Sequence, residues 1–134
     1  MNEASSIGQV LDLVKETMQK TPYEFEVLVV DTNSKDRTRE IAREKGAIVV
    51  EEPRRGYGRA YKTGFERASG DIVATLDADC TYPAEDIPQL SDRLFAENLD
   101  FITTTPASTS VNSTTSAPLR CPPGACGQVP LLPC

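Results

Sequence analysis

The sequence contains no histidine and no tryptophan, and only 6% of its 134 residues are aromatic. The absence of histidine excludes mechanisms that use its imidazole as a base, a metal ligand or a pH switch. Positive charge is not in surplus, because 14 basic residues face 20 acidic ones, and this excludes a protein that binds nucleic acid by neutralising phosphates. No apolar run approaches the roughly 20 residues of a membrane span, and we expect no signal peptide. These absences indicate one small, acidic, cytoplasmic domain.

Charge is also nearly absent from the last 31 residues. Residues 1–103 contain all 20 acidic and 13 of the 14 basic residues, for a net charge of −7, whereas residues 104–134 contain Arg120 alone. This last segment holds six of the ten prolines and has no helical or strand periodicity. Such a segment buries too little apolar surface to offset the entropy cost of ordering. We therefore predict a domain at residues 1–103 and a disordered Ser/Thr/Pro/Cys-rich tail at residues 104–134.

Two alternatives for the tail remain open. One is an out-of-frame or otherwise non-native end. The other is a mucin-like stalk, because Asn112-Ser113-Thr114 fits a glycosylation acceptor. The tail holds three of the four cysteines, and a zinc site would need Cys80 as its fourth ligand. Because structural zinc sites use ligands in close pairs, we expect free thiols instead.

Residues 1–103 alternate between helical and extended apolar patterns. A capping box at Ser6 and Gln9 opens a helix that runs to Met18, and further helices are expected over residues 38–45, 58–68 and 87–95. Apolar runs predict strands over residues 25–30, 47–50, 71–76 and 99–103. The first is expected to be covered on both faces of the sheet, and the second is expected to be buried. The alternation predicts a Rossmann-like α/β layer sandwich with a mainly parallel sheet and right-handed crossovers.

Acidic residues follow two of the predicted strands. Asp31 ends the first strand, and Asp77-Ala78-Asp79 comes directly after the third. Ligands of such sheets bind outside the carboxyl ends of the strands, so we expect these acids to face one crevice. Alternate residues of an extended segment point the same way, which lets Asp77 and Asp79 approach one Mg²⁺ or Mn²⁺ ion. The alternative is a polar loop that caps the next helix.

The only locally basic stretch runs from Arg54 to Gly64. Glycines allow close backbone approach, and arginines beside a helix N-terminus suit phosphate. The stretch is neither a P-loop nor a dinucleotide fingerprint, because Tyr61 stands where the third glycine belongs. Phosphate or sugar binding remains one interpretation, and tight packing of a helix on the sheet through Gly58, Ala60 and Gly64 remains the other.

Four motifs then occur in the order and spacing of a known family: Asn2-Glu3, residues 29–38, Gly56-Tyr57-Gly58-Arg59-Ala60 and Leu76-Asp77-Ala78-Asp79. Over residues 2–103 the chain resembles family 2 glycosyltransferases of the GT-A fold, and most of all the dolichyl- or polyprenyl-phosphate mannosyl and glucosyl synthases. The resemblance implies a GT-A-like fold, a nucleotide-diphospho-sugar donor, a Mg²⁺ or Mn²⁺ ion and inversion at the anomeric carbon.

The resemblance also implies roles for particular residues. Asp77 and Asp79 would hold the metal and the diphosphate, and Ala78 would lie against the nucleotide. The base and ribose pocket would be lined by Glu3, Val30 and Asp31. Arg55 would sit near the donor.

The chain departs from the family pattern in three places. Thr32 stands where the family usually has a second acid beside Asp31. The family's strand ending in Pro-x-Tyr, which is normally central in the sheet, is missing ahead of Asn2. The C-terminal half that recognises the acceptor is replaced by the tail. We therefore expect a sequence truncated at both ends with an incomplete sheet, whose gap is open to another segment or to a second copy of the chain in a homo-oligomer.

The resemblance implies a metal-dependent enzyme that moves a hexose from a nucleotide-diphospho-sugar to a polyprenyl (dolichyl-type) phosphate at the cytoplasmic face of a membrane. The lipid phosphate can act as nucleophile, so no strong protein base is required. The alternative, which we expect of this stretch by itself, is a non-catalytic nucleotide-sugar-binding or interaction fragment without turnover. A phospho-receiver-like domain is disfavoured, because no lysine ends the last strand.

Overall fold

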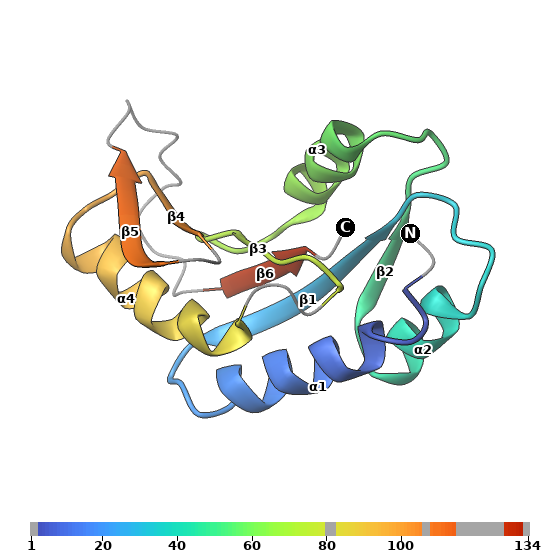
Figure 1. Cartoon of the computed structure of the whole chain (residues 1–134), viewed down its shortest axis with the longest axis horizontal. Coiled ribbons are helices and arrows are strands. Elements are labelled where there is room, and N and C mark those ends of the chain that lie inside the picture. Colours follow the sequence, from blue (N-terminus) through green and yellow to red (C-terminus); the bar gives the residue numbers. More distant parts are fainter. Residues whose placement is uncertain (1–2, 80–82, 106–107, 115–127, 133–134) are drawn as a thin grey trace.

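The described residues form a four-stranded parallel sheet with helices on both faces. The computed structural model describes residues 3–79, 83–105, 108–114 and 128–132. Figure 1 shows the elements, which in chain order are α1 (Ile7–Met18), β1 (Glu24–Asp31), α2 (Thr38–Glu44), β2 (Ile48–Glu51), α3 (Tyr57–Arg67), β3 (Ala74–Thr75), the 3₁₀ turn η1 (Ala84–Asp86), α4 (Ile87–Ala96), β4 (Phe101–Thr105), β5 (Ser108–Thr114) and β6 (Gln128–Leu132).

Strand β1 is buried on both faces of the sheet. Val27 and Val29 belong to the larger core cluster with α1, whereas Leu28 and Val30 pack with Ala60 of α3 in a smaller cluster. Figure 1 shows α1 and α2 on one side of the sheet and α3 on the other. The strand order is β2-β1-β6-β3, and every neighbouring pair is parallel. The predicted α/β layer sandwich with a mainly parallel sheet is confirmed.

Helix α1 supplies much of the larger core cluster. Its apolar residues at helical spacing are at most 4% exposed, and they are Ile7, Val10, Leu11, Val14 and Met18. Burial of one such side chain contributes about 1.5–3 kcal/mol, so this face holds the helix on the sheet. The predicted capping box is wrong, because Ser6 makes no side-chain cap bond and its Oγ instead donates to the main-chain carbonyl of Glu3 at 3.4 Å.

Strand β6 occupies the centre of the sheet, where the sequence analysis expects a gap. Residues 128–131 pair with residues 24–27 of β1, and residues 131–132 pair with residues 74–75 of β3. Another segment of the same chain therefore fills the gap. Both β5 and β6 lie within residues 104–134, so the structure differs there from the expectation of a tail without strands.

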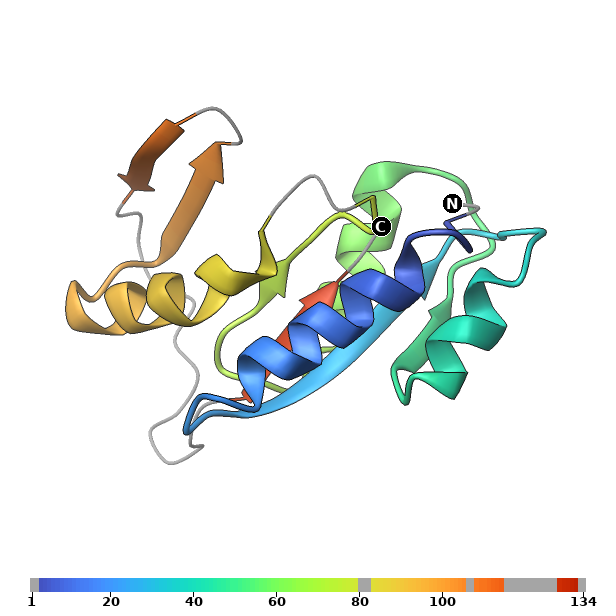
Figure 2. The ribbon, with the colours of Figure 1, turned by 60° about the horizontal axis from the view of Figure 1, so that its bottom comes forward.

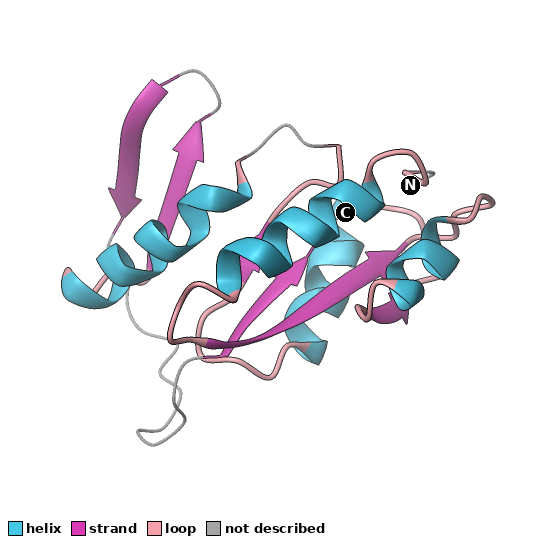
Figure 3. Ribbon diagram, turned by 90° about the horizontal axis from the view of Figure 1, so that it is seen from below, coloured by secondary structure: helices cyan, strands magenta, loops and turns pink. Residues whose placement is uncertain are grey.

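Strands β4 and β5 form a second, antiparallel sheet of their own. Figure 2 shows this hairpin beyond α4, and Figure 3 shows it apart from the parallel strands. The alternating pattern predicts the strand near residue 101 as a further member of the main sheet, and that expectation is wrong. With β6 in the centre and β3 at its side, β4 pairs locally with the strand that follows it.

Strands β2 and β3 are less regular than predicted. β2 pairs only with β1 among the described strands, and as an edge strand it leaves Ile48 51% exposed, so the prediction that this strand is buried is wrong. β3 is two residues long instead of six. Asp77 comes two residues after the end of β3.

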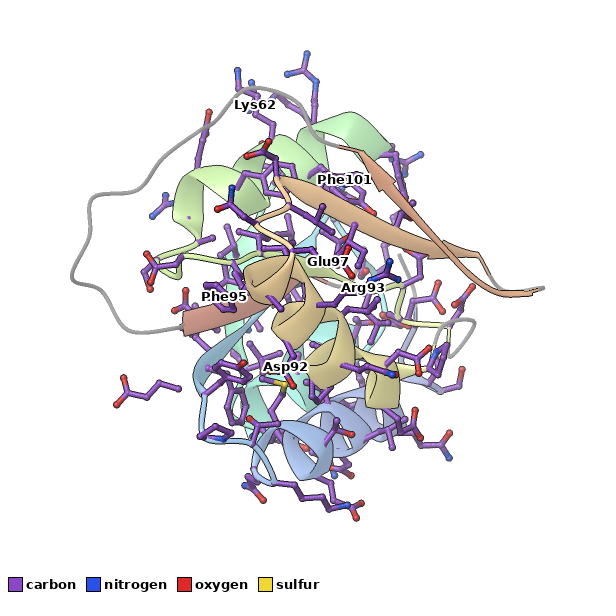
Figure 4. All side chains as sticks on the ribbon, turned by 90° about the vertical axis from the view of Figure 1, so that its left-hand side faces the viewer. Lys62, Asp92, Arg93, Phe95, Glu97 and Phe101 are labelled. Atoms are coloured by element: carbon purple, nitrogen blue, oxygen red, sulfur yellow. The ribbon has the colours of Figure 1, made fainter. Side chains whose placement is uncertain are left out.

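Helix α4 is attached through a polar and an aromatic contact, whose α4 members Asp92 and Phe95 are labelled in Figure 4. The ring of Tyr23 stacks on that of Phe95, with centroids 6.4 Å apart, and the Tyr23 hydroxyl donates to Asp92. Phe95 is nevertheless 51% exposed, whereas Ser91 is buried and its hydroxyl donates to the carbonyl of Ile87 at 2.9 Å.

Candidate functional site

A pocket of about 300 Å³ opens at the carboxyl ends of the parallel strands. Its lining residues include one from the segment after each of three strands: Thr32 after β1, Gly56 after β2 and Asp77 after β3. The lining residues are Glu3, Thr32, Gly56, Tyr57, Ala60, Asp77, Ala78 and Asp79. A crevice is therefore present at the predicted edge of the sheet and includes Asp77 and Asp79, but Asp31, expected to face it as well, does not line it.

Asp77, Ala78 and Asp79 contribute one wall of this pocket directly after β3. Ala78 is 3% exposed, Asp77 is half-buried and Asp79 is exposed. No hydrogen bond or ion pair within the described residues engages the Asp77 carboxylate. Carboxylate oxygens are hard ligands, and Mg²⁺ or Mn²⁺ typically keeps one or two of them from a protein. The pair therefore fits such a cation, while the described part of the chain has no cluster of three or more potential ligands.

Glu3 reaches the pocket because the segment after β1 holds the start of the chain. The Glu3 N–H donates to Thr38 Oγ1 at 3.0 Å, and the Ala4 N–H donates to Asp36 Oδ2 at 3.1 Å. The Thr38 hydroxyl in turn donates to Asp36, and this hydrogen bond lowers the pKa of Asp36 below its ordinary value. Asp36 and Thr38 thus position Glu3. The sequence around Asp36 and Thr38 indicates a turn at the start of α2, but it does not predict their contacts with the backbone of Glu3 and Ala4.

The carboxylate of Asp31 faces α2 rather than the pocket. It accepts the Ser34 N–H at 3.0 and 3.2 Å and pairs with Arg39 Nε at 3.2 Å, with 2% of its side chain exposed. Arg39 also pairs with Glu51 through Nη1 at 3.2 Å. The charge of Asp31 is therefore compensated inside the fold, and its neighbour Thr32 lines the pocket in its place.

The structure divides the predicted site residues into two groups. The pocket brings together Glu3, Asp77, Ala78 and Asp79. Val30, Asp31 and Arg55 do not line it. Val30 is 3% exposed and packs in the sheet beneath α3, and Arg55 is exposed in the loop next to the lining residue Gly56.

Two features next to the pocket have no signal in the sequence. Glu52 is buried behind the basic stretch, where it binds Arg54 and Thr63. An acid two residues before an arginine has the pattern of a surface ion pair, so the sequence carries no signal of this burial. Tyr57 lines the pocket while 63% exposed, and its ring lies 4.8 Å from that of Tyr61 on the next turn of α3.

Proteins with similar sequences include named sugar transferases. The chain is 44% identical over 100 residues to the low-salt glycan biosynthesis hexosyltransferase Agl6 of Haloferax volcanii, a match that covers 75% of this chain and 24% of that protein. It is 36% identical over 99 residues to the undecaprenyl-phosphate 4-deoxy-4-formamido-L-arabinose transferase of Pseudomonas aeruginosa, covering 69% of this chain and 29% of that protein. An uncharacterized glycosyltransferase of Mycobacterium tuberculosis is 42% identical over 90 residues, which are 67% of this chain and 38% of that protein.

The chain thus spans about a quarter to two-fifths of the length of these relatives. No solved structure gives a significant match. None of the helices in the described ranges combines the length and the apolar character that crossing a membrane requires. A family model described as glycosyl transferase family 2 matches residues 1–126, which includes the pocket and all motifs of the resemblance. The chain, with its parallel sheet and strand-end pocket, belongs to glycosyl transferase family 2 and to the GT-A fold of that family.

Proposed function

We propose that this chain supplies the donor-binding part of a metal-dependent glycosyltransferase that moves a hexose from a nucleotide-diphospho-sugar to a polyprenyl phosphate. The observation that carries the proposal is the pocket in which Glu3 and Thr32 meet Asp77 and Asp79 at the carboxyl ends of the strands. The names of two relatives, a hexosyltransferase and an undecaprenyl-phosphate sugar transferase, support the sugar and the lipid phosphate. Because the proposed acceptor is a lipid, the reaction would take place at the surface of a membrane, and we place it at the cytoplasmic face.

The proposed roles follow the walls of the pocket. Asp77 and Asp79 would hold the cation, and Ala78 would lie against the nucleotide. Glu3 would contact the base or ribose from the opposite segment. Val30 and Asp31 would shape that part of the site from behind, since Thr32 and not Asp31 lines the pocket.

The reaction needs charge stabilisation more than a protein base. An oxygen of the acceptor phosphate attacks the anomeric carbon from the face opposite the donor diphosphate. The bond from that carbon to the diphosphate oxygen breaks, and the nucleoside diphosphate leaves with the electron pair, so that the configuration inverts. A divalent cation supplies the charge that offsets the leaving diphosphate. Arg55, beside the pocket, would add a hydrogen-bonding positive charge.

A second candidate is a binding module that holds the nucleotide-sugar without turnover. The size of the pocket favours this candidate for the chain alone, because about 300 Å³ is at the lower end of the range for ligand sites. The two candidates differ in turnover with a polyprenyl phosphate and agree in donor binding.

Calorimetry with GDP-, UDP- and TDP-sugars, with and without Mn²⁺, tests the shared claim. We expect binding that Mn²⁺ strengthens at least tenfold and that Asp79→Ala reduces to the metal-free level. Asp100→Ala is the matched control, because Asp100 is an exposed aspartate outside the pocket, and it should leave binding unchanged. Binding that ignores both Mn²⁺ and Asp79→Ala would show the metal assignment to be wrong.

A further inference from the structure

Glu52 is a charged residue that the fold buries and for which the proposed reaction has no role. It is 4% exposed and comes directly after β2. Its backbone N–H donates to the carbonyl oxygen of Asp31 at 2.9 Å, which continues the pairing of β2 with β1 by one residue. A buried carboxylate is costly unless it is both paired and hydrogen-bonded. The partners of Glu52 therefore indicate what the buried charge achieves.

Four hydrogen bonds converge on the Glu52 carboxylate. Oε1 accepts the Arg54 backbone N–H at 3.0 Å and Arg54 Nε at 2.8 Å. Oε2 accepts Arg54 Nη2 at 2.8 Å and the Thr63 hydroxyl at 2.8 Å. The two parallel bonds from the guanidinium are the bidentate arrangement that fixes geometry best. Hydrogen bonds from Arg54 and then from Thr63 hold the pKa of Glu52 far below its ordinary value, so the residue stays ionised.

These bonds tie the basic loop to two rigid elements at once. The Glu52 carboxylate follows β2 and binds both Arg54 of the loop and Thr63 on the second turn of α3, so it links the loop to a strand and to a helix. Two residues further on, Gly56 lines the pocket with a φ of 140°, a conformation that favours glycine. Its carbonyl accepts the first backbone bonds of α3, from Arg59 and Ala60. The position of this pocket wall therefore depends on the Glu52 contacts.

The same contacts distinguish Arg54 from the neighbouring arginines Arg55 and Arg59. The positive charge of Arg54 is compensated by Glu52. Neither Arg55 nor Arg59 forms an ion pair with any described residue. Both are exposed: Arg55 directly precedes Gly56, and Arg59 lies on the first turn of α3, so they are the arginines beside Gly56 that remain for an anionic ligand.

We propose that Glu52 is a positioning residue for the diphosphate of the donor: by clamping Arg54 and Thr63 it sets the Gly56 wall of the pocket and keeps Arg55 and Arg59 beside it. This inference rests on the proposed function, because it presumes that a nucleoside diphosphate binds in the pocket. It adds that a buried acid, and not only the exposed arginines, determines how strongly the diphosphate is held.

The test compares a nucleoside diphosphate with the nucleoside that lacks its phosphates. The probe is whichever of GDP, UDP and TDP the unaltered chain binds best, together with guanosine, uridine or thymidine, measured by calorimetry and by competition. For Glu52→Gln we expect at least a fivefold loss of diphosphate affinity and less than a twofold change for the nucleoside. A merely structural role would lower both affinities by the same factor.

Two further variants keep the test informative if Glu52→Gln does not fold. Thr63→Val removes one hydrogen bond and leaves the Arg54 pair, so diphosphate affinity should fall by a smaller factor, and Thr63→Ser should restore it. Glu16→Gln is the charge-matched control, because Glu16 is an exposed acid of α1 whose side chain pairs with Lys20. This control should bind both probes like the unaltered chain.

Three results would overturn the inference. Equal loss of both ligands would reduce Glu52 to a structural residue, and unchanged diphosphate affinity would mean that the clamp has no effect. Tighter diphosphate binding would mean that Glu52 withholds Arg54 from the ligand instead of positioning the loop. If the unaltered chain binds no nucleoside diphosphate at all, the proposed function fails together with the inference, which distinguishes that case from the other three.

Discussion

Replacing Arg39 by alanine should destabilise the fold through the buried carboxylate of Asp31. Removing one partner of a buried ion pair typically costs about 3–5 kcal/mol, because the other charge stays behind unpaired. Two features reduce this cost: Arg39 is 30% exposed, and Asp31 keeps its two contacts to the Ser34 N–H. The exposed contact of Arg39 with Glu51 adds less than about 1 kcal/mol. We therefore expect a loss of about 2–3 kcal/mol.

Urea unfolding followed by circular dichroism measures this loss. With a slope of about 1.5 kcal/mol per M, the midpoint should fall by roughly 1.3–2 M. Arg43→Ala is the matched control on the same helix, since Arg43 is 55% exposed and pairs with the exposed Glu51, and it should cost less than about 0.5 kcal/mol. In an Asp31→Asn background, Arg39→Ala should cost less than about 1 kcal/mol, because no charge is left unpaired. Similar midpoints for Arg39→Ala and Arg43→Ala would refute the reasoning.

Three further predictions follow from the sheet, from α3 and from Glu52. Deletion of residues 128–134 removes β6 and roughly five ladder hydrogen bonds at about 0.5–1.5 kcal/mol each, a loss of about 2.5–7.5 kcal/mol, and exposes two strand edges. Ultracentrifugation should then detect self-association, and a stable monomer would contradict the assigned centre of the sheet. Gly58→Ala should stabilise the protein by about 0.5–1 kcal/mol in thermal unfolding, because an added Cβ at this helical position meets open space, and a destabilised variant would contradict this. The unaltered chain should be more stable than Glu52→Gln, and this difference should be fully present above the ordinary glutamate pKa and shrink as the pH falls toward the lowered pKa of Glu52. Urea unfolding at pH 7 and pH 3 measures the difference. A difference that grows in acid would contradict the lowered pKa.

The elements that could be predicted are those with a local pattern. The helical spacing from Ile7 to Met18 predicts both the bounds of α1 and its buried face, and the unbroken apolar run of β1 predicts burial on both sides of a sheet. β6 has no such pattern, because it is formed by pairing with distant strands. It even contains Pro130, which cannot donate to a ladder and argues against a central strand in any sequence-based prediction.

The candidate site divides in the same way. Asp77 and Asp79 could be predicted because an acid pair after a strand lies at the sheet edge where ligands bind. The direction of Asp31 could not be predicted, because it depends on Arg39, whose guanidinium approaches from the helix packed against the strand end. The burial and contacts of Glu52 could not be predicted for the same reason, since Thr63 reaches Glu52 only when α3 packs on the sheet.

The central place of β6 has a consequence for the folding of the chain during its synthesis on the ribosome. The strands on either side of it, β1 and β3, are synthesised well before residues 128–132. Roughly a hundred residues separate β1 from β6, and at about 5–20 residues per second the nascent chain waits about 5–20 s before the sheet can close. During that interval the strand edges of β1 and β3 are open to any extended segment nearby. Chaperones and other chains can therefore bind these edges before β6 is synthesised and pairs with them.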